Sequence, residues 1–287
     1  MSLVSMGPLL RDASKKQYAV GAFNMVNLEF LGAVIAAAEN LQTPVIVNIA
    51  EVHFSFIDVE LCAHAVRFAA ARSSVPVALN LDHGLSFETA ARALALGFTS
   101  IMFDGSGLPL EDNIRISAEI GRMCHASGAA LEAELGSVGA EGDGGLESEA
   151  DPRLFTDPEL AEDFVRRTCC DALAVAIGNS HGKYKGEPRL DFDRLATLRK
   201  AAGIPLVLHG GSGISADDFR RAIGLGISKI NYFTGMSQAA LELVHKPADN
   251  KIEQYNDYPQ LILETGRAVR SVVEQQMRVF LNGVKPL

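Results

Sequence analysis

The stretch VPVALNLDHG, from Val75 to Gly84, decides the fold. It is a short apolar run that is bounded by Pro76 and Gly84 and that ends in two titratable side chains, Asp82 and His83. Such a run is typical of a strand that is buried on both faces of a parallel sheet. In α/β folds the carboxyl ends of parallel strands carry the binding and catalytic residues. We therefore expect Asp82 and His83 to face a functional site.

Two later stretches repeat this pattern. The run IPLVLHGGSG, Ile204–Gly213, is apolar up to His209, and the run ALAVAIGNSHG, Ala172–Gly182, leads to His181. The sequence thus contains strands that deliver His83, His181 and His209 to the same kind of position, and we expect these three imidazoles to meet.

Strand-like and helix-like segments alternate along the whole chain. The predicted strands are Ala19–Phe23, Pro44–Ile49, Val77–Leu81, Thr99–Phe103, Ala129–Leu135, Ala172–Ile177, Pro205–Leu208 and Ile227–Ile230. The predicted helices are Leu28–Asn40, Val59–Ala71, Phe87–Leu96, Pro109–His125, Pro158–Thr168, Phe192–Ala201, a helix capped by Ser215 that runs to Ile223, Thr234–His245 and a last amphipathic helix over about 258–282.

Eight βα units with right-handed crossovers predict an α/β fold, a single (β/α)8 TIM barrel over 1–287 with an additional C-terminal helix. A doubly wound sheet is the alternative, but the chain lacks its GxGxxG opening. The stretch of about 136–151 is rich in glycine and acidic residues and lacks an apolar period. We predict that it is a mobile loop with a catalytic role.

The composition excludes several classes of function. The chain has 287 residues, of which 48% are hydrophobic, and a formal net charge of −9, which disfavours binding to nucleic acid or to an anionic membrane. The sequence shows no signal peptide and no membrane-spanning stretch. The four cysteines lack metal-ligand spacing and are interpreted as reduced residues of a cytoplasmic protein.

The predicted strand ends carry further polar groups. Asp104 follows the fourth strand, and Glu132 and Glu134 lie on the fifth. Imidazoles and carboxylates at one barrel mouth are typical of a catalytic zinc site with an open position. The other histidines, His53, His64, His125 and His245, are interpreted as surface or capping residues.

A phosphate site is predicted at the last two strands. The sequence His209-Gly210-Gly211-Ser212-Gly213 lies between a strand and a helix, where backbone N–H groups bind phosphate. Asn231-Tyr232-Phe233-Thr234 opens the following helix, and phosphate sites after these strands recur in barrels. On its own, however, GGSG is more often only a tight turn, and its placement between a strand and a helix is what favours a phosphate site.

The motifs NLDHG, LEAELG, AIGNSHG, VLHGGSG and KINYFT together resemble the class II, zinc-dependent ketose-bisphosphate aldolases, which include the fructose- and tagatose-bisphosphate enzymes. The resemblance extends from about Tyr18 to Val273. It implies that one Zn²⁺ is held by the three histidines and that Asp82 gives a proton to the aldehyde oxygen. It also implies that Asp104 and Glu134 lie near an alternative metal position. The residues implied to bind the phosphorylated substrate are Asn24, Gly182, Gly210, Gly211, Ser212, Asn231, Tyr232, Phe233 and Thr234.

The implied reaction is the reversible cleavage of a ketose 1-phosphate or ketose 1,6-bisphosphate to dihydroxyacetone phosphate and an aldehyde, through an enediolate that the metal stabilises. The family also implies a homodimer or homotetramer and a monovalent cation near the phosphate. Two alternatives stay open, a metal-dependent sugar-phosphate epimerase or isomerase and a non-catalytic aldolase-like subunit. A Schiff-base mechanism at Lys229 is disfavoured because strand alternation does not place this residue at the metal.

The chain departs from the family pattern at three places. The usual loop glutamate is replaced by Gly142, so we choose its neighbour Glu141 as the base. Tyr232 and Phe233 are bulkier than usual, and the second strand ends in Ala50-Glu51 in place of a serine. The segment Asp257–Thr265 has no arginine for a distal phosphate, although Arg267 or Arg270 could replace it. The aldehyde product could therefore be unphosphorylated or differently shaped.

Overall fold

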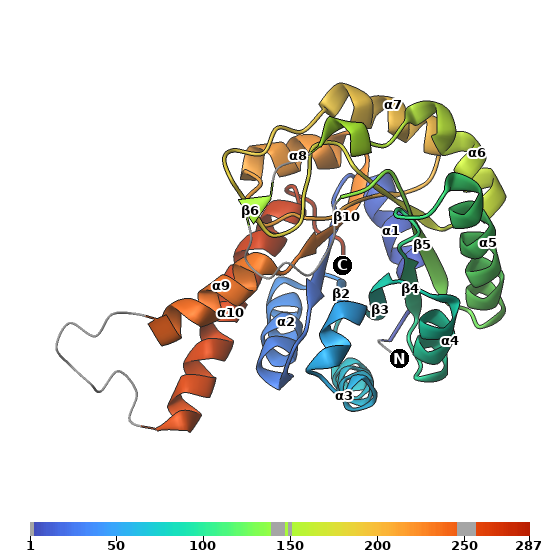
Figure 1. Ribbon diagram of the computed structural model, residues 1–287. Coiled ribbons are helices and arrows are strands. Elements are labelled where there is room, and N and C mark those ends of the chain that lie inside the picture. Colours follow the sequence, from blue (N-terminus) through green and yellow to red (C-terminus); the bar gives the residue numbers. More distant parts are fainter. Residues whose placement is uncertain (1–2, 139–146, 149–150, 246–256) are drawn as a thin grey trace.

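Eight parallel strands close into a barrel in the computed structural model, which describes residues 3–138, 147–148, 151–245 and 257–287 (Figure 1). The strands are β1 (Val20–Asn24), β2 (Val45–Ala50), β3 (Val77–Gly84), β4 (Ser100–Phe103), β5 (Ala130–Leu135), β7 (Ala172–Val175), β9 (Leu206–Leu208) and β10 (Ile227–Tyr232). Their order around the barrel is β1-β10-β9-β7-β5-β4-β3-β2. The predicted fold is therefore confirmed, with strand bounds that mostly shift by one or two residues.

Helices between the strands surround the barrel (Figure 1). They are α2 (Leu28–Leu41), α3 (Val59–Arg72), α4 (Phe87–Ala95), α5 (Leu110–Ala126), α6 (Pro158–Thr168), α7 (Phe192–Ala202), α8 (Ala216–Gly224) and α9 (Thr234–His245), followed by the C-terminal α10 (Tyr258–Phe280). The predicted cap of α8 is confirmed, since Ser215 accepts a bond from the backbone N–H three residues on, and Asn27 and Ser86 cap α2 and α4 in the same way. In the described part of the chain, no helix is long and apolar enough to cross a membrane.

The sequence did not predict the first helix, α1 (Met6–Lys16). This helix closes the amino-terminal end of the barrel. Met6, Leu10 and Ala13 are fully buried there against inward-facing side chains such as Ile46 and Val207. The barrel thus has an apolar floor and leaves the carboxyl ends of its strands as the open mouth.

The predicted loop over about 136–151 contains a short element. β6 (Glu147–Ser148) pairs in parallel with β8 (Lys183–Tyr184), which follows His181, and the two form a separate sheet. Two short helical turns complete the chain, η1 (Glu51–Ser55) after β2 and η2 (Pro152–Leu154) before α6.

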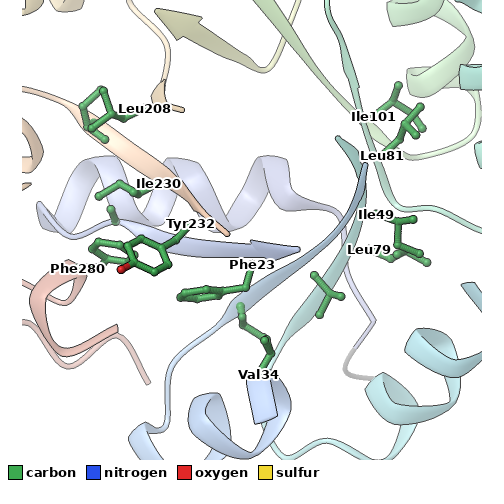
Figure 2. Close-up of a cluster of buried hydrophobic side chains, with 14 of the residues drawn as sticks. Phe23, Val34, Ile49, Leu79, Leu81, Ile101, Leu208, Ile230, Tyr232 and Phe280 are labelled. Carbon is green, nitrogen blue, oxygen red and sulfur yellow. The ribbon is translucent and has the colours of Figure 1, made fainter. Parts of the chain in front are cut away.

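A second apolar layer fills the space between the barrel and its helices. Figure 2 shows part of it, with Phe23 and Tyr232 from neighbouring strands beside Phe280 of α10. The rings of Phe23 and Tyr232 meet edge to face at 6.4 Å, and Phe280 stacks on Phe23 at 6.4 Å. This packing fixes the side chains that point outward from the strands and leaves the inward-facing ones to build the site.

Candidate active site

The backbone of β3 turns at its end so that two consecutive residues reach the mouth. Successive side chains of a strand point to opposite faces, so Asp82 and His83 would normally separate. His83 has φ +46°, and the pairing of β3 with β4 shifts register between Leu81 and Gly84. This irregularity returns the His83 ring to the side of Asp82, and both side chains are buried.

The loops after β7 and β9 present the other two histidines and are tied together. The Tyr184 hydroxyl accepts a bond from Ser180 N–H and donates one to Gly210 O, each at 2.9 Å. Asn179 Nδ2 donates to His209 O at 3.1 Å. These bonds place His181 beside His209, which directly follows β9 and is fully buried.

The three predicted histidines come together at the mouth. One nitrogen from each of His83, His181 and His209 lies within 4.8 Å of the others. His83 Nδ1 lies 2.9 Å from Asp104 Oδ2, and His209 Nε2 lies 2.7 Å from Glu132 Oε1. Each carboxylate accepts a ring N–H, so the nitrogens that face each other, His83 Nε2 and His209 Nδ1 at 2.9 Å, both offer lone pairs. Facing lone pairs fit a bound cation.

A second possible metal group shares His83. It consists of His83, Asp104 and Glu134, again with one ligand atom each within 4.8 Å. Burial, followed by repulsion from Asp104, raises the pKa of Glu134 to about 8. Its Oε1 accepts from Val138 N–H, while its buried Oε2 has no hydrogen-bond partner among the residues that the structure describes. An orphaned buried carboxylate oxygen beside another carboxylate also fits a cation.

Asp82 is fixed by two asparagines. Asn24 Nδ2 donates to Oδ2 and Asn231 Nδ2 donates to Oδ1, each at 2.8 Å. Burial works to raise the pKa of Asp82, but the positive charge of the buried Lys229 and the bond from Asn24 lower it below its usual value. The carboxylate is thus held ionised and oriented beside the histidine cluster.

The residues predicted to bind phosphate lie in the loops after β7 and β9 and at the junction of β10 with α9. Gly210 has φ +63°, and a Cβ there would lie 2.2 Å from Ser180 O, so only glycine fits. Ser212 Oγ accepts from Gly235 N–H at 3.1 Å, which joins this loop to the start of α9 at Thr234. Gly211 N–H donates to Asn231 O at 3.2 Å, so this N–H group already has an acceptor within the protein. Gly182 lies in the His181 loop with φ +84°.

The two aromatic residues after β10 have different surroundings. Tyr232 is 8% exposed, with its ring against Phe23 in the outer core and its hydroxyl in hydrogen-bond contact with Ser212 of the loop after β9. Phe233 is half-buried and contacts His53, with 5.0 Å between ring centroids. The interpretation of His53 as a surface or capping residue was wrong: it is 8% exposed and lies against both Phe233 and Phe56.

Most of the residues at which the sequence departs from the family pattern lie in the described part of the chain, where their contacts can be given. Glu51 accepts from Leu85 N–H at 2.7 Å and from Thr89 Oγ1 at 2.9 Å, so it supports the start of α4. Arg267 and Arg270 are bonded to glutamates on α10 itself. The proposed base Glu141, with Gly142, lies outside the described residues.

Sequence reasoning missed several residues that support the site. Glu132 was noted only as a strand-end carboxylate, and Lys229 only as an unsuitable Schiff base, yet they bond to each other within the barrel at 2.6 Å. The period of two along β5 and β10, which turns Glu132 and Lys229 inward, was the available signal. Tyr184 and Asn179 act through loop contacts that no sequence pattern indicates.

Comparison with known proteins places the chain in one family. The family model "Fructose-bisphosphate aldolase class-II" matches residues 4–284. A fructose-bisphosphate aldolase of Geobacillus stearothermophilus is 41% identical over 98% of this chain and 97% of its own length. A probable fructose-bisphosphate aldolase of Bacillus subtilis is 39% identical over 98% of each chain.

Solved structures agree with this assignment. The crystal structure of the YdjI aldolase from Escherichia coli K12 matches with a TM-score of 0.87 and 37% identity, and the match covers 99% of this chain and 100% of that one. With the histidine cluster at the mouth of a barrel that is matched along its length, the chain belongs to the class II fructose-bisphosphate aldolase family, whose members are lyases.

Proposed function

We propose that this protein is a zinc-dependent aldolase that reversibly cleaves a ketose 1-phosphate or a ketose 1,6-bisphosphate to dihydroxyacetone phosphate and an aldehyde. The observation that carries the proposal is the convergence of His83, His181 and His209 at one mouth beside Asp82. The fructose-bisphosphate aldolases among its relatives support the substrate class.

The metal would be held by the three histidines. Burial and the neighbouring His83 lower the pKa of His209 well below its usual value, so the ring is neutral and suited to a metal. Imidazole ligands with an open position are typical of catalytic zinc. When bound, the ion would withdraw charge from the ketone oxygen and so acidify the adjacent C–H bond. Asp104 and Glu134 would serve the alternative metal position.

Asp82 would move the hydroxyl proton. In cleavage its carboxylate takes the proton from the sugar hydroxyl, and in condensation it returns that proton to the aldehyde oxygen. The bonds from Asn24 and Asn231 hold its two oxygens in place. For the C–H proton we keep Glu141 as the proposed base.

The phosphate of the substrate would lie among the loops that Tyr184 and Ser212 join. Gly182, Gly210 and Ser212 come from the loops after β7 and β9, and Asn231 and Thr234 from the end of β10 and the start of α9. Backbone N–H groups in glycine-rich loops bind phosphate without a large positive field, which suits a chain of net charge −9.

The proposal is tested by zinc content and product release in one experiment. Purified wild type and His209→Ala are assayed for bound zinc per chain and for dihydroxyacetone phosphate released from a panel of ketose phosphates, with and without chelator. We expect about one zinc in the wild type by the single-site chemistry above, its loss in the variant, and cleavage that the chelator abolishes. Conversion of a sugar phosphate to an isomer without release of dihydroxyacetone phosphate would favour the epimerase. A folded wild type without zinc or cleavage would favour the non-catalytic subunit.

We also propose that the chain forms a homodimer or homotetramer in the cytoplasm. Phe56, which follows η1, and Leu61 and Phe68 on α3 expose more than half of their surface, as interface residues do in an isolated chain. All four cysteines are unpaired thiols, as a reducing compartment would keep them. Light scattering coupled to gel filtration would measure the assembly, and a monomer would contradict it.

A further inference from the structure

A chain of buried charged groups lies beside the histidine cluster. Lys229 Nζ on β10 donates to Glu132 Oε2 on β5 at 2.6 Å, and Glu132 Oε1 lies 2.7 Å from His209 Nε2. None of the three side chains is accessible to solvent. A buried ion pair is a poor source of stability compared with apolar packing. Its contact with His209 suggests that it serves the site instead.

The neighbours of His209 determine which ring nitrogen carries the proton. At Nε2 the neighbour is the carboxylate of Glu132, which accepts, so Nε2 carries the hydrogen. At Nδ1 the amide Nδ2 of Asn231 lies 3.1 Å away and donates, and His83 Nε2, at 2.9 Å, offers a lone pair because the His83 ring proton lies on Nδ1 toward Asp104, so Nδ1 of His209 keeps its own lone pair. Contacts on both sides of the ring therefore agree on one tautomer, and its lone pair faces the histidine cluster.

Lys229 makes both oxygens of Glu132 necessary. The ammonium group can only donate, and so can the Nε2–H of His209, so residue 132 must accept twice. A glutamine in its place has one oxygen, which the charge of Lys229 attracts more strongly than a neutral imidazole does. Its NH2 group would then face His209 Nε2, and the ring proton would move to Nδ1.

We propose that Glu132 and Lys229 are positioning residues that hold His209 in the tautomer with hydrogen on Nε2, so that Nδ1 remains available to the metal ion. This inference rests on the zinc site of the proposed function. It extends that proposal to residues that lie beyond the ligands themselves.

The test compares the zinc affinity of folded, metal-free protein by competition with a chromophoric chelator. The key pair consists of two double variants, Lys229→Met with Glu132→Gln and Lys229→Met with Glu132→Leu. Both remove the buried ion pair, but only the glutamine keeps an acceptor for His209. We expect the leucine variant to bind zinc about 10–100-fold more weakly than the wild type, as for other lost partners of metal-bound histidines. The glutamine variant should keep most of the wild-type affinity.

The single variant Glu132→Gln isolates the part played by Lys229. We expect it to weaken zinc binding about 10–100-fold, and the added Lys229→Met to restore it. Long-range ¹H–¹⁵N NMR of histidine-labelled, metal-free protein should find the His209 proton on Nε2 in the wild type and on Nδ1 in the single variant. A residue that only stabilised the barrel would leave this tautomer unchanged.

The outcomes separate this inference from the proposed function. Equal zinc affinities of the two double variants, or a wild-type tautomer in the folded Glu132→Gln protein, would overturn the inference while the zinc site stands. A wild type that binds no zinc would overturn both. Should Glu132→Gln fail to fold, the two double variants still decide, because neither leaves a buried charge unpaired.

Discussion

Tyr184→Phe should loosen the loop that carries His181 and leave the barrel folded. The hydroxyl makes two bonds, from Ser180 N–H and to Gly210 O, and the ring lies close to Gly213. Phenylalanine keeps the ring and removes both bonds. A hydrogen bond contributes about 0.5–1.5 kcal/mol, so the local stability of the two loops should fall by about 1–3 kcal/mol.

Hydrogen exchange followed by mass spectrometry measures this loss directly. Because about 1.4 kcal/mol is a factor of ten, the Ser180 amide should exchange about 5–140 times faster. The matched control is Tyr18→Phe, which removes a 3.1 Å bond to Asp12 at the closed end of the barrel and should leave Ser180 unchanged. Unchanged exchange at Ser180 in Tyr184→Phe, or equally faster exchange in all barrel strands, would refute the reasoning.

Three further predictions concern the proposed proton donor, the proposed phosphate loop and the barrel floor. Asp82→Asn should lower kcat about 10²–10⁴-fold with bound zinc unchanged; steady-state kinetics with wild-type turnover would contradict its role. Gly210→Ala should raise KM for the sugar phosphate and destabilise by at least about 1–2 kcal/mol, because φ is +63° and the new Cβ meets Ser180 O. Gly186→Ala, where a Cβ meets nothing within 4 Å, is its control. Leu10→Ala should lower the free energy of unfolding in urea by about 2–5 kcal/mol and spare kcat, whereas the exposed Leu287→Ala should change neither.

The barrel strands were predictable because each is a short apolar run between turn residues, and burial on both faces leaves such runs without polar interruptions. The helix α1 was not predictable, because Gly7 and Pro8 directly follow its first residue, and glycine and proline normally indicate that a helix is interrupted. Proline is tolerated in the first turn of a helix, where its missing N–H has no partner in any case. The sheet of β6 and β8 is too short to have a pattern.

The histidines of the site were predictable because they follow strand ends, whereas residues placed by side-chain packing were not. Tyr232 shares a motif with Asn231 and Thr234 and is predicted with them to bind the substrate, but the motif does not show where its ring lies. Along β10, Lys229 and Asn231 bond within the barrel interior, whereas the Tyr232 ring packs on Phe23 outside it and its hydroxyl contacts Ser212. The burial of His53 depends on Phe233, which comes from a distant part of the chain, as well as on its near neighbour Phe56.

The three residues Asp82, His83 and Gly84 act as one structural unit. A regular strand would send the His83 side chain outward to the helices, and the left-handed φ that returns it to the mouth costs about 1–2 kcal/mol in a residue with a side chain. The bond from its ring to Asp104 offsets part of this cost. The same turn brings the backbone close to β4, where a Cβ on residue 84 would lie 2.9 Å from Met102 O, so glycine is required. The motif therefore joins the proposed proton donor, a proposed metal ligand and the glycine that permits both side chains to face one site.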